Sequence, residues 1–412
     1  MDGVTLLLAA TAISGLYMAW NIGANDVANA MGTSVGSGAL TLRSALIVAA
    51  LFEFVGALFA GGTVTRTISA GIVETEVIGG DPLVMAVGMT ACLIAASIWL
   101  HIATSKGWPV STTHSIVGAV LGFGLYVGGG SGVRWGVLGS IVASWFLSPA
   151  LGGLLGYAIF SLIKRRVLNA PDALAGLHRI GPPLAFVVLT VVAFAITYEG
   201  VEQLRLDQPA RIALPIASAV GLVGALIVHV MLRSRRSLLG DGSPTDRAER
   251  LFLVLQVLTA CAVAFAHGSN DVANAVGPMA AVFHAMSEGV AEQVAIPLNV
   301  LMIGAFGIVL GLGTYGFRVM ATVGSEITAL TPSRGFAAEA AAAIVIVLAS
   351  KLGLPVSTTH TIVGAIVGVG LARSFGAVNL DVIRGVLASW LITVPFAALI
   401  SAALVALVTA FL

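Results

Sequence analysis

The stretch NIGANDVANAMG (Asn21–Gly32) returns in altered form as AHGSNDVANAVG (Ala266–Gly277). A second stretch, GWPVSTTHSIVGAVLG (Gly107–Gly122), returns as GLPVSTTHTIVGAIVG (Gly353–Gly368). The copies lie 245 residues apart in the first motif and 246 residues apart in the second. Two motifs that recur at nearly the same spacing indicate that the chain contains an internal duplication.

The composition of the chain is that of a membrane protein. Of the 412 residues, 58% are hydrophobic and 9% are charged, whereas a soluble domain carries about 25% charged residues. The 49 glycines suit helices that pack closely in lipid. The net charge of +1 gives no reason to expect a nucleic-acid partner.

About 12 apolar segments are long enough to cross a bilayer, which needs about 20 apolar residues per helix. The sequence therefore predicts an all-α integral membrane protein. The segments centre near Ser14, Phe54, Cys92, Val117, Val142, Val188, Gly221, Val257, Ala305, Ala343, Ala365 and Leu399. The stretches around 84–127 and 335–373 are expected either to span the bilayer or to re-enter it.

The basic residues predict the orientation, because cytoplasmic loops are enriched in Lys and Arg. With twelve crossings and both termini outside, most of the 20 Lys and Arg residues fall in inside loops. We therefore expect both termini to be extracellular or periplasmic. The polar stretch Arg233–Arg250 is interpreted as a cytoplasmic linker. It divides the chain into a first repeat (1–165), connecting helices with the linker (166–250), and a second repeat (251–412).

The two repeats are expected to have opposite orientations in the bilayer. The first NDVANA motif lies in the first predicted segment and the second lies in the eighth. Seven crossings separate them, and an odd number inverts the second copy. Inverted repeats with broken or re-entrant helices are typical of secondary transporters, whose sites lie near the midplane between the repeats.

The NDVANA motif places a carboxylate and two amides on one helical face in each half. The six residues are Asn25, Asp26 and Asn29, and Asn270, Asp271 and Asn274. An intramembrane Asp costs roughly 2.5–3.5 kcal/mol on insertion scales, so a duplicated Asp indicates a function. Carboxylate and amide oxygens suit a hard cation such as Na⁺. The structural alternative is a network that caps helices broken at Gly23 and Gly268.

The PVSTTH motif places hydroxyl groups at a predicted helix N-terminus, because proline is favoured in the first helical turn. Hydroxyls, free backbone N–H groups and the positive end of the helix dipole together favour an anion. A single copy would usually be an N-cap, but two copies related by an inverted repeat predict one shared site. The hydroxyl residues are Ser111, Thr112 and Thr113, and Ser357, Thr358 and Thr359.

The charges at this site predict coupled transport. Two ionised Asp residues and an anion together carry at least three negative charges, which a low-dielectric site cannot hold without cations. Na⁺ or H⁺ would therefore enter together with the anion. The candidate sodium ligands are Asn25, Asp26, Ser111, Asn270, Asp271 and Ser357.

Two more carboxylates and two histidines are candidates for coupling. Glu53 and Glu339 lie in apolar surroundings. Each is either a coupling group or a residue near a helix end that pairs with an Arg. His114 and His360 follow the hydroxyl triplets, as structural donors or as groups that carry a proton. The remaining intramembrane histidines have no duplicated pattern and are interpreted as structural: His101, His229, His267 and His284.

The NDVANA and PVSTTH motifs resemble the signatures of the PiT family of inorganic phosphate transporters. The stretch Ile327–His360 is also similar to the second-half motif of that family. The resemblance covers nearly the whole chain. It implies cation-coupled uptake of inorganic phosphate, with Na⁺ favoured, by a homodimer in a bacterial or archaeal plasma membrane. It also implies that Glu53 and Glu339 take part in transport.

The resemblance implies that Asp26 and Asp271 belong to the cation and phosphate sites, with Asn25, Asn270 and the two hydroxyl triplets around them. The predicted phosphate site combines acidic, amide and hydroxyl residues of both motifs. They are Asp26, Asn29, Ser111, Thr112, Thr113, Asp271, Asn274, Ser357, Thr358 and Thr359. No cofactor is expected beyond the co-transported ion.

Several other functions remain open from the sequence. Proton-coupled transport of phosphate or of a metal–phosphate complex uses the same groups. A sulfate permease fits less well, because monoanionic phosphate can donate hydrogen bonds to the Asp residues and sulfate cannot. A membrane-embedded phosphatase would use the hydroxyls as nucleophiles, but a symmetric site lacks distinct acid and base roles and no nucleotide-binding loop is present.

Overall fold

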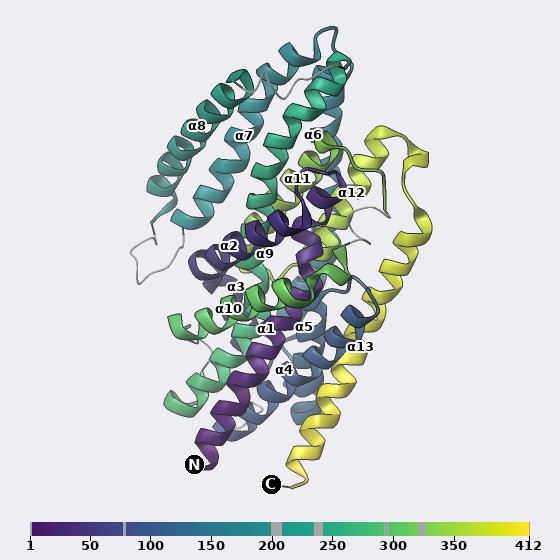
Figure 1. Ribbon diagram of the computed structural model, residues 1–412. Coiled ribbons are helices and arrows are strands. Elements are labelled where there is room, and N and C mark those ends of the chain that lie inside the picture. The colour runs from purple at the N-terminus through teal and green to yellow at the C-terminus, as the bar shows by residue number, and fades with distance from the viewer. Residues whose placement is uncertain are drawn as a thin grey trace.

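The computed structural model describes residues 2–76, 80–198, 208–234, 242–291, 294, 296–320 and 327–411. These residues fold into α-helices joined by short turns (Figure 1). The helices are α1 (Gly3–Gly36), α2 (Leu42–Ala60), α3 (Gly62–Ala70), α4 (Pro82–Ser105), α5 (Thr112–Gly128), α6 (Trp135–Ile163), α7 (Ala173–Thr197), α8 (Ala210–Ser234), α9 (Pro244–Glu288), α10 (Leu298–Tyr315), α11 (Pro332–Lys351), α12 (Thr358–Arg373) and α13 (Leu380–Thr409).

The all-α integral membrane fold predicted from the sequence is confirmed. Within the described residues, 11 helices are long and apolar enough to cross a bilayer. Each of the predicted segments lies in one of these helices or in α12, which has only 16 residues. Helix α3, with nine residues, was not predicted. Large apolar side chains such as Phe146 and Leu391 are 75% and 78% exposed, as side chains that face lipid are.

The two ends of the chain lie at the same end of the molecule (Figure 1). Helices α4 and α5 lie toward that end, whereas α11 and α12 lie toward the opposite end. Each pair is a hairpin whose turn, at 106–111 or 352–357, precedes a helix that starts inside the protein. This arrangement is that of two re-entrant hairpins entering from opposite sides.

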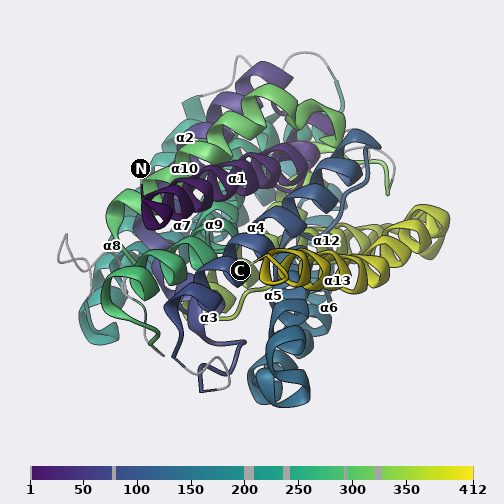
Figure 2. The ribbon, with the colours of Figure 1, turned by 90° about the horizontal axis from the view of Figure 1, so that it is seen from below.

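Each repeat packs on the other through equivalent contacts. Helix α1 packs on α10 as α9 packs on α2, and α5 packs on α13 as α12 packs on α6. Figure 2 shows α5, α6, α12 and α13 gathered together when the molecule is seen from below. The two repeats therefore interlock around a shared centre. The boundaries 1–165, 166–250 and 251–412 remain a prediction from the sequence.

The helices that carry the NDVANA motifs are continuous, so the structural alternative, with helices broken at Gly23 and Gly268, is wrong. Helix α1 runs unbroken for 34 residues and α9 for 45. The two glycines instead allow helices to approach closely. A Cβ atom on Gly23 would overlap the carbonyl of Ile308, and one on Gly268 would overlap the carbonyl of Glu53.

Replacing Gly268 by Ala should therefore destabilise the protein by about 1–3 kcal/mol, because the added methyl group forces α9 and α2 apart. Thermal unfolding of the purified protein in detergent measures the effect. Gly136→Ala in α6 is the matched control, since its added methyl group meets no atom within 4 Å. That variant should be as stable as the wild type or slightly more stable. Equal melting temperatures for both variants would contradict the packing role.

Candidate functional site

The two PVSTTH motifs form the starts of α5 and α12 deep inside the protein. The Ser111 hydroxyl accepts a hydrogen bond from the backbone N–H of His114 at 3.1 Å, and Ser357 accepts from His360 at 3.2 Å. Both serines are therefore N-caps. The sequence predicted that the prolines lie in the first helical turn, and this prediction is wrong. They lie two residues before the serine caps. The threonine hydroxyls are left to line the site.

Asn25 holds the turn before α5 in place. Its amide donates to the Thr104 hydroxyl at 2.8 Å and to the Trp108 carbonyl at 3.1 Å, and its oxygen accepts from the N–H of Val110. In the second repeat, the Asn270 amide lies 2.9 Å from the Ser350 hydroxyl. Both residues were predicted as cation ligands, and the structure shows them anchoring the re-entrant turns to α1 and α9.

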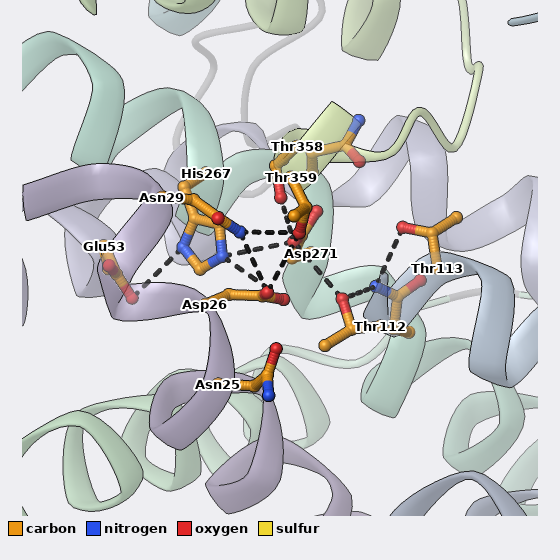
Figure 3. Close-up of polar contacts among 12 residues, drawn as sticks. Asn25, Asp26, Asn29, Glu53, Thr112, Thr113, His267, Asp271, Thr358 and Thr359 are labelled. Carbon is orange, nitrogen blue, oxygen red and sulfur yellow. Dashed lines mark hydrogen bonds and ion pairs between the residues drawn. The ribbon is translucent and has the colours of Figure 1, made fainter. Parts of the chain in front are cut away.

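The threonines of each hairpin meet the acidic helices at the centre (Figure 3). Thr358 donates to Asp271 Oδ2 at 2.8 Å and Thr112 lies 3.4 Å from the same oxygen. Thr359 donates to Asp26 Oδ1 at 3.3 Å. Hydroxyls from both repeats thus surround two carboxylates that are fully buried.

The remaining amides link each helix to the hairpin of the other repeat. Asn29 donates to the Thr359 hydroxyl at 2.8 Å and to Asp26 Oδ1 at 2.9 Å. Asn274 donates to the hydroxyls of Thr112 and Thr113 at 3.2 and 3.3 Å. The structure therefore brings the predicted phosphate-site residues of both repeats together in one buried cluster.

Three oxygen atoms of this cluster have no hydrogen-bond donor within the described residues. They are Asp26 Oδ2, Asn29 Oδ1 and Asn274 Oδ1, and all three are inaccessible to solvent. A buried acceptor without a donor costs about 1–3 kcal/mol. A carboxylate oxygen and amide oxygens are the kinds of ligand that suit Na⁺, and a cation at such an oxygen would satisfy it. The residues present therefore fit a bound cation.

His267 lies among the carboxylates, where the sequence analysis had interpreted it as structural. Its Nε2 atom is 3.1 Å from Asp271 Oδ2 and 3.9 Å from Asp26 Oδ2, and its Nδ1 atom is 3.3 Å from Glu53 Oε2 (Figure 3). It is 1% exposed. It has no duplicate, because the equivalent position in the first repeat is Ile22. Its spacing of four residues before Asp271 on an apolar helix was the available signal.

The two glutamates predicted to take part in coupling lie in separate places. Glu53 of α2 contacts the central cluster through His267, and neither of its carboxylate oxygens has a hydrogen-bond partner among the described residues. Glu339 of α11 contacts Thr33 and Ser34 of α1. Thr33 is seven residues after Asp26, about 10 Å along the helix at 1.5 Å per residue.

Glu339 is fully satisfied by hydrogen bonds. Thr33 donates to it at 2.5 Å, Ser34 at 2.6 Å, Thr259 at 2.7 Å and Gln256 at 3.3 Å. The side chain joins α1, α9 and α11. The alternative in which either glutamate pairs with an Arg at a helix end finds no such contact among the described residues.

Comparison with known proteins identifies the family. The model of the phosphate transporter family matches residues 22–401. A protein of Haemophilus influenzae is 46% identical over 388 residues, which cover 93% of this chain and 92% of that protein. The inorganic phosphate transporter 2-1 of Arabidopsis thaliana chloroplasts is 44% identical over 421 residues, 95% of this chain and 70% of that one.

The structural comparison leads to the same family. A solved structure described as the sodium-dependent phosphate transporter is 42% identical and superposes with a TM-score of 0.92, covering 99% of this chain and 100% of that chain. Matches of this extent include both repeats and both signature motifs. The chain therefore belongs to the phosphate transporter family, a family of membrane transporters and not of enzymes.

Proposed function

We propose that the protein is a Na⁺-coupled symporter of inorganic phosphate. The observation that carries the proposal is the central cluster, where two helix N-termini and three threonine hydroxyls face two buried carboxylates. The hydroxyls donate to a tetrahedral oxyanion, and a protonated phosphate oxygen donates to Asp26 or Asp271. This pairing favours phosphate over sulfate, which has no proton to donate at neutral pH.

Symport follows from the charges at the site. Phosphate and two carboxylates cannot share a buried volume without positive charge, and among the described residues no Lys or Arg contacts the cluster. The donor-free oxygens of Asp26, Asn29 and Asn274 supply the hard ligands of a Na⁺ site. The similarity to a structure named as sodium-dependent supports the same ion.

Transport of a metal–phosphate complex is the second candidate, and one observation favours it. One ligand atom each from Asp26, His267 and Asp271 lies within 4.8 Å of the others. An imidazole with two carboxylates suits a divalent transition metal better than Na⁺. On this view His267 would hold the metal of the cargo.

Uptake of radiolabelled phosphate into proteoliposomes distinguishes the candidates. We expect uptake with an inward Na⁺ gradient and no pH gradient, and background uptake with a pH gradient in Na⁺-free medium. Uptake should persist with EDTA and with a hundredfold excess of sulfate, since the site prefers a protonated oxyanion. Loss of uptake in EDTA would instead support the metal–phosphate substrate. Uptake driven equally well by the pH gradient alone would contradict Na⁺ coupling.

We also propose the membrane placement and assembly that the sequence and the family resemblance imply. The termini would face the outside of a bacterial or archaeal plasma membrane, and the protein would be a homodimer. Protease removal of a C-terminal tag from right-side-out vesicles tests the orientation. Light scattering of the purified protein tests the dimer, and a monomeric mass would overturn it.

A further inference from the structure

An apolar pocket outside the phosphate site lies between α6, α12 and α13. Its volume is about 1000 Å³, and it is lined by Phe146 and Leu154 of α6, Val367 of α12 and Leu391 of α13. Phe146 and Leu391 are 75% and 78% exposed. Since these helices are membrane segments, the mouth of the pocket opens toward lipid and not toward water.

Aromatic residues from both repeats form the floor of this pocket. His114 packs against Trp145 with ring centroids 3.7 Å apart, and His360 packs against Trp390 at 3.3 Å. The two histidine rings lie 4.3 Å apart. Both histidines directly follow the threonines of the central cluster. A molecule in the pocket would therefore contact the helices that form the phosphate site, from the opposite side.

One end of the pocket carries a group of basic residues. The ammonium group of Lys164, at the end of α6, donates to the carbonyls of Ala372 and Arg373 at the end of α12. The group comprises Lys164, Arg373 and Arg384, and the two arginines lie within two residues of the lining residues Leu371 and Ile383. The only acid paired within this group among the described residues is the exposed Asp381, 3.2 Å from Arg384. The pocket extends toward this end through Tyr157, Leu371 and Ile383.

We propose that this pocket binds an anionic phospholipid of the surrounding bilayer. The headgroup phosphate would lie at the basic group and an acyl chain would fill the pocket, as in basic sites between membrane helices elsewhere. Arg373 and His360 are 13 residues apart on α12, about 20 Å along the helix axis. One leaflet of the hydrocarbon core is about 15 Å thick. The two lengths are of the same order, so a single acyl chain extends most of the way from the headgroup level to the aromatic floor.

Quenching of tryptophan fluorescence tests the proposal, because Trp145 and Trp390 line the pocket. The purified full-length protein is placed in phosphatidylcholine vesicles that contain increasing fractions of phosphatidylglycerol brominated on its acyl chains. Brominated phosphatidylcholine gives the reference for ordinary lipid contact. We expect half-maximal quenching at a phosphatidylglycerol fraction at least about fivefold lower than that of phosphatidylcholine, since each basic contact favours an anionic lipid.

Two variants, each with a matched control, separate the pocket from general lipid contact. Ala150→Phe places a ring in the pocket and should abolish the preference, whereas Ala143→Phe, also exposed on α6 but outside the pocket, should keep it. Arg384→Gln should weaken the preference about fivefold, and the exposed Arg211→Gln on α8 should not. The arginine variants change only exposed side chains, so they remain informative if Ala150→Phe does not fold.

The outcomes against the proposal are equally specific. Identical quenching by the two brominated lipids in the wild type would overturn it, as would an unchanged preference in both Ala150→Phe and Arg384→Gln. Absence of quenching of Trp145 and Trp390 by either lipid, judged with Trp145→Phe and Trp390→Phe variants, would show that another chain covers the pocket. None of these results depends on which ion drives phosphate uptake.

Discussion

Phosphate uptake driven by a cation gradient should fall by about 1,000-fold in the Asp271→Asn variant, to the background of empty vesicles. The substitution keeps the shape of the side chain and one acceptor oxygen for Thr358. It removes one buried negative charge. A charge pair about 4 Å apart contributes about 4 kcal/mol at an effective dielectric constant of 20. The affinity of the protein for the cation therefore falls by about three orders of magnitude. Without the cation, no positive charge balances the bound phosphate.

Asp26→Asn should have an effect of similar size, with a larger change in the Na⁺ dependence. Asp26 Oδ2 has no hydrogen-bond donor, whereas Asp271 Oδ2 lies 2.8 Å from the Thr358 hydroxyl and 3.1 Å from His267. The donor-free oxygen is the better cation ligand. Titration of the purified proteins with Na⁺ should therefore show weaker Na⁺ binding in Asp26→Asn than in Asp271→Asn.

The control for both variants is Asp172→Asn, at the exposed N-cap of α7, where Asn caps a helix as well as Asp does. It should transport phosphate like the wild type. All three proteins should elute as single peaks and unfold at similar temperatures. Wild-type uptake in Asp26→Asn or Asp271→Asn, with the protein intact, would show that these carboxylates do not hold the coupling ions.

Much of this architecture was predictable because the chain repeats itself. Any costly polar residue that occurs twice at equivalent places, such as Asp26 and Asp271, stands out from an apolar background. Apolar runs of about 20 residues located the helices, and the turns before Thr112 and Thr358 were recognisable from Gly and Pro. These signals are local in sequence, and local signals suffice for helix positions and for motif residues.

The features that the sequence did not reveal depend on contacts between distant segments. Gly23 and Gly268 resemble helix breaks in isolation, and only the carbonyls of Ile308 and Glu53 show that they allow close packing. His267 has no duplicate, so a search for symmetry discards it. Each difference arises where a neighbour far along the chain determines the role of a side chain.

The contact between His267 and Glu53 breaks the symmetry of the fold. Gly23 of α1 faces the carbonyl of Ile308, just as Gly268 of α9 faces that of Glu53. By this correspondence, His267 and Glu53 take the places that Ile22 and Ile308 occupy in the other repeat. Both isoleucines are fully buried. The fold therefore accepts an apolar pair at this position, and the polar pair is present on one side only.

Substitution with the residues of the other repeat tests what the polar pair does. His267→Ile alone should destabilise the protein by about 3–5 kcal/mol, because it leaves Glu53 buried without a partner. The double variant His267→Ile/Glu53→Ile should recover most of that stability, since a well-packed apolar pair replaces buried ionic groups at little cost. Thermal unfolding in detergent measures both changes.

Transport should not recover in the double variant. His267 lies between Asp271 and Glu53, so its loss removes the imidazole beside Asp271 Oδ2 and separates Glu53 from the cluster. Phosphate uptake should stay at background although the protein is stable. Ile22→Val, at the matching position of the other repeat, loses one methylene group at a cost of about 0.5–1.5 kcal/mol and should still transport. A stable double variant that transports at the wild-type rate would show that the polar pair only fills space as the isoleucine pair does. The asymmetry of the site would then have no part in coupling.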